Sequence, residues 1–465
     1  NQKEFNEKSR ILFKSYPGLG IDKNFIYSNQ EKIRKYLQPH SPMNIFLQSI
    51  DENKLVLDVG NNQSIPLVIE NITIGGRKIN FTNKNFVYKG KRKKNYVKYS
   101  KLIIPINKTY FNDFQKEKKI LLTYKLDGID NRFMQSNINL YPRYSPEEIK
   151  KIIIRKTSNV DDLDFLDLDE KSKIIRFKQG NIFINKPLII PKGYTLKAFP
   201  GTNIKINKKG FILSRSPVEF VGNSSNKIII ESNNLNLGNG IVILDSNKVS
   251  IIKNVLFRNL ESIDTSHWSV SGAVTFYESP VKIDNAIFEN SNAEDSLNIV
   301  RSEFSLRNCS FYDSKSDALD IDFSNGYIEN ITIQNSQNDG LDFSGSDITG
   351  NQILIFNSGD KAVSIGEGSN VDINNLRIDK SFIGIASKDG SESKITNLSI
   401  NSSKYDFAVF KKKYEYTSSI ANVLNFNKEV NQTNYLLGND SILNINSKKM
   451  KENYDNDYIF NLLYQ

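Results

Sequence analysis

The chain has 465 residues, a net charge of +10 and 38% hydrophobic residues, which is enough for two or three folded domains. The single cysteine, Cys309, excludes a framework of internal disulfides. No apolar run approaches 18 residues and no nucleic-acid-binding module accompanies the basic segments, so we expect neither a membrane span nor a nucleic-acid partner. Residues 281–391 contain 18 Asp and Glu but only 8 Lys and Arg, so one stretch of an otherwise basic chain is acidic.

The N-terminal third is predicted to contain three regions. Residues 1–44 form a polar arm. Residues 45–142 contain short strand-like runs separated by Asn, Gly and Lys, which predicts a small β-sandwich-like domain. Residues 143–169 include SPEEIKKIIIRKTS, which has the composition of a helix N-terminus and predicts a helical connector.

A repeat of 21 to 24 residues dominates the rest of the chain. A motif such as DALDIDFS (317–324) recurs between residues 272 and 400, and a short β-rich stretch around an Asn, such as IENITI, follows each copy. This period leaves no room for helices and predicts an all-β solenoid. We expect its coils over residues 170–425, followed by a polar cap over 426–465.

Asn residues recur at one position of the repeat. Stacked Asn side chains satisfy backbone groups at a bend, so we predict a structural ladder there. The gap from Asn254 to Asn285 is about nine residues longer than one coil. It predicts a protruding loop that carries His267 and Trp268.

Carboxylates line up when the copies are aligned on an inward column of Leu297, Leu319, Leu341, Val363 and Ala386. Stacked coils are about 4.8 Å apart, and like charges at that distance repel by roughly 1 kcal/mol per pair in water. A cation is therefore expected nearby, although Asp is also an ordinary turn former. The three outward columns contain Asp295, Asp317, Asp339, Lys361 and Gly384; Asp320, Asp342, Ser364 and Ser387; and Asp322, Ser344, Gly366 and Asp389.

The coil pattern resembles the right-handed parallel β-helix, or pectate-lyase-like, superfamily over roughly residues 170–425. The string SGAVTFYES…EDSLNIVRSEF…SDALDIDF…NDGLDFSGS…DKAVSIGEGS…ASKDGS is also similar to poorly characterised bacterial β-helix proteins. This resemblance implies the fold, which hosts lyases, hydrolases, epimerases, tailspikes and adhesins. The D-P-H-D motif of mannuronan-epimerase-like sites and the G-H-G element of polygalacturonase-like sites are absent. Lyases of this fold use a Lys or Arg base, and Ca²⁺ or another group neutralises the uronate carboxylate.

These observations predict a secreted, periplasmic or cell-surface protein that acts on or binds an acidic polysaccharide. A lyase or epimerase removes the proton α to a carboxylate, which requires a base and a cation. A hydrolase would instead use two Asp of the patch as acid and base. The alternative is a non-catalytic structural or adhesive protein that binds glycan or cations.

The candidate residues fall into three groups. Lys361 is the predicted base and Lys388 the second candidate. An oxygen-only, Asp-rich site suits Ca²⁺, so a calcium site is expected. The predicted catalytic set is Lys361, Lys388, Asp317 and Asp339; the substrate-binding set is Arg301, Tyr277, Trp268 and Asp295; and the metal ligands are Asp320, Asp322, Asp342 and Glu367.

Overall fold

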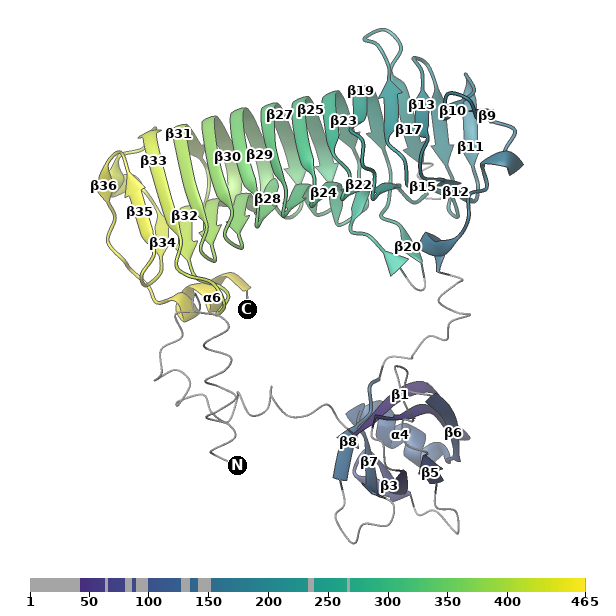
Figure 1. The fold of residues 1–465 in the computed structure, drawn as a ribbon. Coiled ribbons are helices and arrows are strands. Elements are labelled where there is room, and N and C mark those ends of the chain that lie inside the picture. Colours follow the sequence, from purple (N-terminus) through teal and green to yellow (C-terminus); the bar gives the residue numbers. More distant parts are fainter. Residues whose placement is uncertain are drawn as a thin grey trace, which may run out of the picture. The chain divides into compact units, whose positions relative to one another are not determined.

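The chain folds into two compact units, Asn1–Glu148 and Ile149–Gln465. As predicted, the fold is mostly β, with small sheets in the first unit and a β-solenoid of about twelve turns in the second (Figure 1). None of the described helices is long and apolar enough to cross a membrane. The computed structural model describes residues 42–62, 66–79, 86–88, 99–126, 134–140, 152–232, 238–265 and 268–464.

The described part of the first unit contains two antiparallel sheets and one helix. Apolar side chains alternate along the strands, and Leu57 from one sheet and Ile72 from the other belong to the same core. Helix α4 (Lys108–Glu117) was not expected from the sequence, because Phe114 is its only buried residue and no apolar period marks it. The sheets are formed by β1 (Met43–Ile50), β2 (Lys54–Asn61) and β6 (Tyr99–Pro105), and by β3 (Leu67–Ile74), β4 (Arg77–Ile79), β5 (Phe86–Tyr88), β7 (Ile120–Leu126) and β8 (Met134–Asn137).

The predicted helical connector is not a continuous helix where it is described. Residues 143–151 lie outside the described residues, and the following segment contains two short 3-10 helices, η1 (Ile153–Arg155) and η2 (Val160–Asp162). Asn159 separates them and anchors the chain to the first coil. Its Nδ2 donates to the carbonyl of Pro187 and its Oδ1 accepts from the N–H of Ile189, both at 2.9 Å. These contacts fix the segment before η2 on the solenoid, while the first half of the stretch with helical composition lies outside the described residues.

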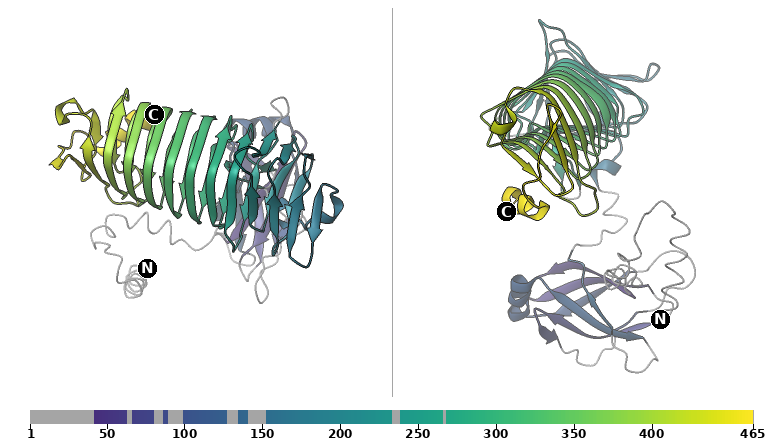
Figure 2. Two further views of the ribbon diagram at one scale, coloured as in Figure 1. Left: turned by 90° about the horizontal axis from the view of Figure 1, so that it is seen from above. Right: turned by 90° about the vertical axis from the view of Figure 1, so that its left-hand side faces the viewer.

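The solenoid coils have three sides, and neighbouring coils pair in parallel (Figure 2). In the first three coils each side has its own strand. These strands are β10 (Ile174–Phe177), β11 (Asn181–Ile184), β12 (Pro187–Ile190), β13 (Thr195–Ala198), β14 (Asn203–Ile206), β15 (Phe211–Ser214), β16 (Val218–Val221), β17 (Ile228–Ser232) and β18 (Ile241–Leu244).

Later coils join the first two sides in one bent strand. These bent strands are β19 (Ser250–Arg258), β23 (Val281–Glu289), β25 (Glu303–Ser314), β27 (Asn325–Ser336), β31 (Glu392–Asn401) and β33 (Ile420–Phe426). Strands β29 (Asp347–Gly366) and β30 (Asn370–Lys388) continue around all three sides. The third side consists of β12, β15, β18, β22 (Gly272–Tyr277), β24 (Asp295–Val300), β26 (Asp317–Asp322), β28 (Leu341–Ser344), the ends of β29 and β30, β32 (Tyr405–Phe410) and β34 (Tyr435–Leu437).

Both ends of the solenoid carry an antiparallel strand. Strand β9 (Leu166–Asp169) pairs with β10, and β36 (Lys448–Lys449) pairs with β35 (Ile442–Ile445). The coils continue past residue 425, where the sequence pattern fades, because Leu443 and Ile445 still fill the same core. The remaining elements are the hairpin β20 (Asp264–Thr265) and β21 (Trp268–Ser269), the 3-10 helix η3 (Val430–Gln432) and helix α6 (Asn456–Tyr464).

The repeated Asn residues form the structural ladder that the sequence predicts. Asn330 adopts a left-handed φ of 53°, a conformation that Asn tolerates better than most residues. Its Nδ2 donates to Oδ1 of Asn308 on the preceding coil at 2.8 Å, and Asn425 donates to Asn397 at 2.9 Å. Each Asn therefore fixes the bend between the first two sides and links two coils.

Candidate functional site

The predicted acidic columns are present on the outward surface of the third side. Asp295 pairs with Asp317, and Asp320 pairs with Asp342. The N–H of Asp339 donates to Oδ1 of Asp317 at 2.8 Å, so Asp339 extends the first column. Adjacent coils therefore bring these side chains together.

The alignment of the following coil is wrong by one residue. Lys361 pairs with Ile383 rather than with Gly384, so Ile385 points inward and Ala386 lies beside Ser364 in an outward column. The coil that begins at Lys361 is one residue shorter than the predicted alignment of Lys361 with Gly384 requires. A shift of one residue moves every side chain of the strand to the opposite face. Lys388, rather than Asp389, then follows Gly366 in the third column, since Ser387 pairs with Ile365.

The carboxyls of the first column are buried. Only 2% of Asp295, 8% of Asp317 and 3% of Asp339 is exposed. Burial, followed by the neighbouring Asp317 and Glu294, raises the pKa of Asp295 to about 8. Burial likewise raises the pKa of Asp317 to about 6 and that of Asp339 to about 7. Protonation thus relieves part of the repulsion that the sequence implies.

Asp317 and Asp339 act mainly as backbone-capping residues. Oδ1 of Asp317 accepts hydrogen bonds from Nδ2 of Asn338 and from the N–H of Asp339, at 2.6 and 2.8 Å. Oδ1 of Asp339 accepts the N–H of Lys361 at 2.9 Å. Each carboxyl therefore secures the start of the next strand, and this geometry favours the turn-forming interpretation over the predicted catalytic one for both residues.

Asp320, Asp322 and Asp342 form a second group, which is half-buried. Nδ2 of Asn298 donates to Oδ2 of Asp320 at 2.9 Å and to Oδ2 of Asp322 at 3.3 Å. Burial raises the pKa of Asp320 well above its usual value, and the charges of Asp295, Asp322 and Asp342 add to that shift. This group, which we call the carboxyl cluster, therefore offers a proton donor beside other carboxyl groups.

The two predicted catalytic lysines are buried cations. Nζ of Lys361 lies 3.4 Å from Oδ1 of Asp339 and also contacts Asp360. Burial opposes the charge on Lys361, but its acidic neighbours outweigh burial and raise its pKa. The pKa of Lys388 is also raised, again against burial, through Tyr464 and Asp342. A lyase base needs a lowered pKa, so this finding argues against both lysines in that role.

Glu367, a predicted calcium ligand, already has protein partners. It accepts a hydrogen bond from Oγ of Ser344 at 2.8 Å and forms an ion pair with Lys413. Within the described ranges, no group of three or more His, Cys, Asp and Glu side chains is arranged to hold a metal ion. Calcium binding consequently stays a prediction, without a preformed ligand set.

Of the predicted substrate-binding residues, Arg301 and Tyr277 lie together while Trp268 lies elsewhere. Nη1 of Arg301 donates to the hydroxyl of Tyr277 at 2.6 Å. Trp268 belongs to the β20–β21 hairpin and packs against a buried cluster that includes Leu213 and Val242 on the third side. It therefore anchors the hairpin on the solenoid, away from Arg301 and Tyr277, and His267 lies outside the described residues.

Apolar covers flank the polar part of the third side. The β20–β21 hairpin packs over the first coils, and Ile459 of α6 packs over the last ones with Ala408 and Phe410. Figure 1 shows both elements on the same side of the solenoid, near its two ends. The carboxyl cluster lies between these covers.

Residues outside the repeat complete the site, and most were missed. Lys412 lies with Nζ 4.0 Å from the ring centre of Tyr464, and Lys361 lies 5.5 Å from the same ring. Residues 410–416 (FKKKYEY) stand out in the sequence only by their positive charge, although charge complementarity with Glu367 could have located Lys413. Tyr464 had no sequence signal, because the tail that carries it has no repeat.

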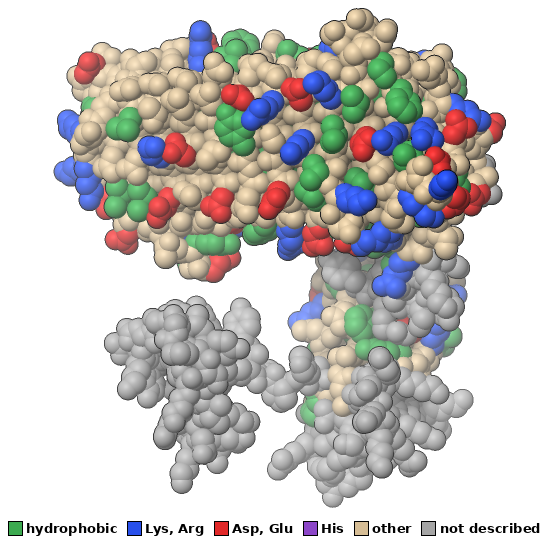
Figure 3. All heavy atoms as spheres, turned by 45° about the horizontal axis from the view of Figure 1, so that its top comes forward, with side chains coloured by type: hydrophobic (Ala, Val, Ile, Leu, Met, Phe, Trp, Pro, Cys, Tyr) green, Lys and Arg blue, Asp and Glu red, His purple; other side chains and the backbone are tan. Residues whose placement is uncertain are grey.

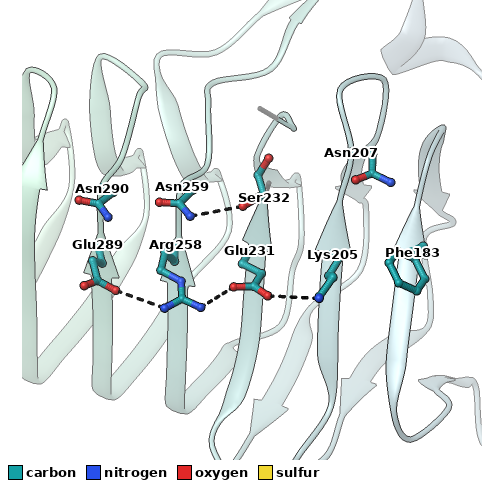
Figure 4. A pocket seen from close by; sticks show the side chains of 9 residues that line it. All are labelled: Phe183, Lys205, Asn207, Glu231, Ser232, Arg258, Asn259, Glu289 and Asn290. Carbon is teal, nitrogen blue, oxygen red and sulfur yellow. Dashed lines mark hydrogen bonds and ion pairs between the residues drawn. The ribbon is translucent and has the colours of Figure 1, made fainter. Parts of the chain in front are cut away.

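A separate cavity of about 590 Å³ lies on the second side of the early coils. Figure 4 shows a row of Glu289, Arg258, Glu231 and Lys205 on neighbouring strands. Arg258 lies 2.5 Å from Glu231 and 3.9 Å from Glu289. Acidic and basic side chains are also interspersed on the face in Figure 3. Because this row is internally paired, it links coils and leaves no charge to attract an ionic ligand.

Comparisons with known proteins do not assign the chain to a family. No protein-family model matches the chain, and no curated protein does. Solved structures that are similar include the catalytic unit of a GH87 α-1,3-glucanase from Streptomyces thermodiastaticus strain HF3-3, with 7% identity, coverage of 84% of this chain and 97% of that chain, and a TM-score of 0.30. An alginate lyase from Paenibacillus sp. str. FPU-7 has 8% identity, coverage of 56% and 97%, and a TM-score of 0.31. Tailspike protein 2 of bacteriophage CBA120 has 12% identity, coverage of 57% and 47%, and a TM-score of 0.22. Such low scores carry no argument about fold or activity, so both must be argued from the β-solenoid and the acidic third side of this chain itself.

Proposed function

We propose that the third side binds an acidic polysaccharide and hydrolyses its glycosidic bonds at the carboxyl cluster. One observation carries this proposal: Asp320, whose pKa is raised, is paired in register with Asp342 on the next coil. Glycoside hydrolysis needs two protein carboxyls. One is protonated and donates its proton to the leaving oxygen, and the other attacks the anomeric carbon of the sugar or activates a water molecule that does so. Asp320 is the proposed acid and Asp342 the proposed partner.

The acidic character of the substrate follows from the lysines at one end of the cluster. The half-buried Lys412 is the relevant cation, because burial and then the charges of Lys388 and Lys361 lower its pKa, whereas those two lysines are buried and their pKa values are raised. Carboxylate or similar groups on a glycan would relieve the repulsion among these charges. A polymer of this kind is met outside the cytoplasm, so the proposal includes a secreted, periplasmic or cell-surface location, which detection in fractions of the source cells would test.

A panel of neutral and uronate polysaccharides, incubated with the full chain, tests the reaction. New reducing ends without ultraviolet-absorbing unsaturated ends support hydrolysis, and unsaturated ends would show a lyase instead. Asp320→Asn and Asp342→Asn should each abolish turnover. Asp347→Asn, an exposed carboxylate outside the third side, is the matched control and should keep it. Binding without any cleavage would support the structural or adhesive alternative.

Calcium is the alternative proposal for the same cluster, because a carboxyl that binds Ca²⁺ is ionised and cannot serve as the protonated acid. If Asp320, Asp322 and Asp342 bind Ca²⁺, the melting temperature should rise in proportion to ln(1 + [Ca²⁺]/Kd), where Kd is the dissociation constant of the ion. Asp320→Asn combined with Asp342→Asn should remove that increase. A melting temperature that is the same with Ca²⁺ and with a chelator would exclude the calcium site.

A further inference from the structure

Phe323 is an exposed aromatic residue in a strained conformation beside the carboxyl cluster. It directly follows Asp322, 53% of it is exposed, and its φ is 49°. A left-handed backbone is unusual for a bulky residue and costs on the order of 1–3 kcal/mol. Burial of the ring does not compensate for this strain, so local packing gives no reason for a Phe at this position.

The neighbouring coils hold the ring in a fixed place. The guanidinium carbon of Arg301 lies 5.5 Å from the centre of the Phe323 ring and 5.8 Å from that of Tyr277. Arg301 also donates to the Tyr277 hydroxyl, which fixes the guanidinium plane. On the following coil, a Cβ atom at Gly345 would lie only 2.6 Å from Cδ1 of Phe323. The ring is thus supported by Arg301 and accommodated by the missing side chain of Gly345.

We propose that Phe323, supported by Arg301 and Tyr277, is a stacking platform for one sugar ring of a glycan that continues to the carboxyl cluster. This inference rests on the proposed function, because the carboxyl cluster defines the direction in which the bound glycan would run from Phe323. Pyranose rings have an apolar face of C–H groups, which an exposed and immobilised aromatic ring can cover. Arg301 adds a cation that suits an acidic sugar. The backbone N–H of Arg301 donates to the carbonyl of Asp322 at 2.9 Å, which places the platform at the edge of the cluster.

Affinity electrophoresis through gels that contain individual polysaccharides tests the platform. All variants are made in the Asp320→Asn background, so that cleavage does not interfere. Phe323→Ala should weaken retardation by the bound polysaccharide about tenfold, and Phe323→Trp should keep it. Phe356→Ala, which removes another exposed ring of 41% exposure outside the third side, is the control and should leave retardation unchanged.

Two glycine variants distinguish an effect of displacing the Phe323 ring from an effect of backbone strain alone. Gly345 and Gly368 both have positive φ, of 60° and 74°, but only a Cβ at Gly345 meets the Phe323 ring, whereas a Cβ at Gly368 meets nothing within 4 Å. Gly345→Ala should therefore weaken binding, and Gly368→Ala should not. Phe323→Gly should melt at or above the temperature of the parent, because relief of the left-handed strain offsets the loss of the exposed contact with Arg301.

Three results would overturn the platform: unchanged retardation of Phe323→Ala, a clear drop in the melting temperature of Phe323→Gly, or no retardation of the parent by any polysaccharide. Failure of the stacking platform can be told apart from failure of the proposed hydrolysis, because one is measured as binding and the other as release of reducing ends. Loss of binding in Phe323→Ala, together with a wild-type protein that releases no reducing ends, keeps the platform and rejects hydrolysis.

Discussion

Nζ of Lys388 donates a hydrogen bond of 2.9 Å to Oγ of Ser364 on the preceding coil. The ammonium group reaches that position across Gly366, where a Cβ would lie 3.5 Å from Cε of Lys388. Lys388 thereby extends toward the column that contains Asp342 and supplies a cation from the chain itself. The sequence predicts a cation near these carboxylates but does not identify it.

The first prediction concerns coupling between Lys388 and Asp342. Lys388→Met should lower the free energy of unfolding near neutral pH, because the raised pKa of Lys388 means that the fold favours its charge. Asp342→Asn should restore part of the loss, with a coupling energy of about 0.5–3 kcal/mol in a double-mutant cycle by urea denaturation. Lys394→Met, which removes an exposed ion pair with Asp372, is the control and should change stability by less than about 1 kcal/mol. Strict additivity would contradict the coupling.

The second prediction concerns pH. The pKa of Asp295 rises from 3.8 to about 8, so between these values the folded state holds a proton that the unfolded chain has released. The contribution of Asp295 to the free energy of unfolding is therefore fully present below pH 3.8 and is lost as the pH rises toward about 8. In thermal melts, Asp295→Asn should therefore resemble the wild type at pH 4 and exceed it at pH 8. An equal difference at both pH values would disprove the raised pKa.

The third prediction concerns the stereochemistry of cleavage. Paired positions on adjacent coils are about 4.8 Å apart, close to the separation of about 5–5.5 Å between the two carboxyls of retaining glycosidases. Asp342 should then act as nucleophile and the product should keep the anomeric configuration, as NMR of the first product shows. The rate should fall on the alkaline side only above the usual titration range of a carboxyl, because the pKa of Asp320 is raised. An inverted product would assign the second role to a more distant carboxyl.

The fourth prediction concerns the core. Phe288 stacks between Phe257 and Phe311, with ring centres 5.0 and 4.7 Å away. Phe288→Ala should reduce the free energy of unfolding by about 3–5 kcal/mol, because it leaves a cavity between two rings. Phe356→Ala, at an exposed ring, should have a much smaller effect in the same urea titration. Similar losses in both variants would show that the stack adds little.

The sequence predicted the coils and most of the acidic register, because both follow from a local repeat. Asp320 and Asp342 share an offset from an inward Leu, and strand alternation then places them on one face. The pairing of Lys361 with Ile383 was not predicted, because Gly384, one residue later, matched the Gly at the start of the first copy of the repeat.

The environment of the carboxyls could not be predicted in the same way. Asp339 is buried beside Lys361 of the next coil, and Lys361 in turn lies under Tyr464 of α6, an element outside the repeat. The periodic pattern contains no information about that element. The capping role of Asp317 was foreseen only as an alternative, because turn formers and catalytic acids share one residue type.

The register between β27 and β29 has a consequence for how this chain can vary in length. Asn325 pairs with Asp347 and Ser336 with Ser358, a constant offset along the bent strand. Duplication or deletion of one whole coil there would keep every inward residue inward, whereas a single-residue insertion would turn one strand inside out. The gene segment for this part can therefore grow or shrink in whole coils, and each added coil would lengthen the third side by about 4.8 Å.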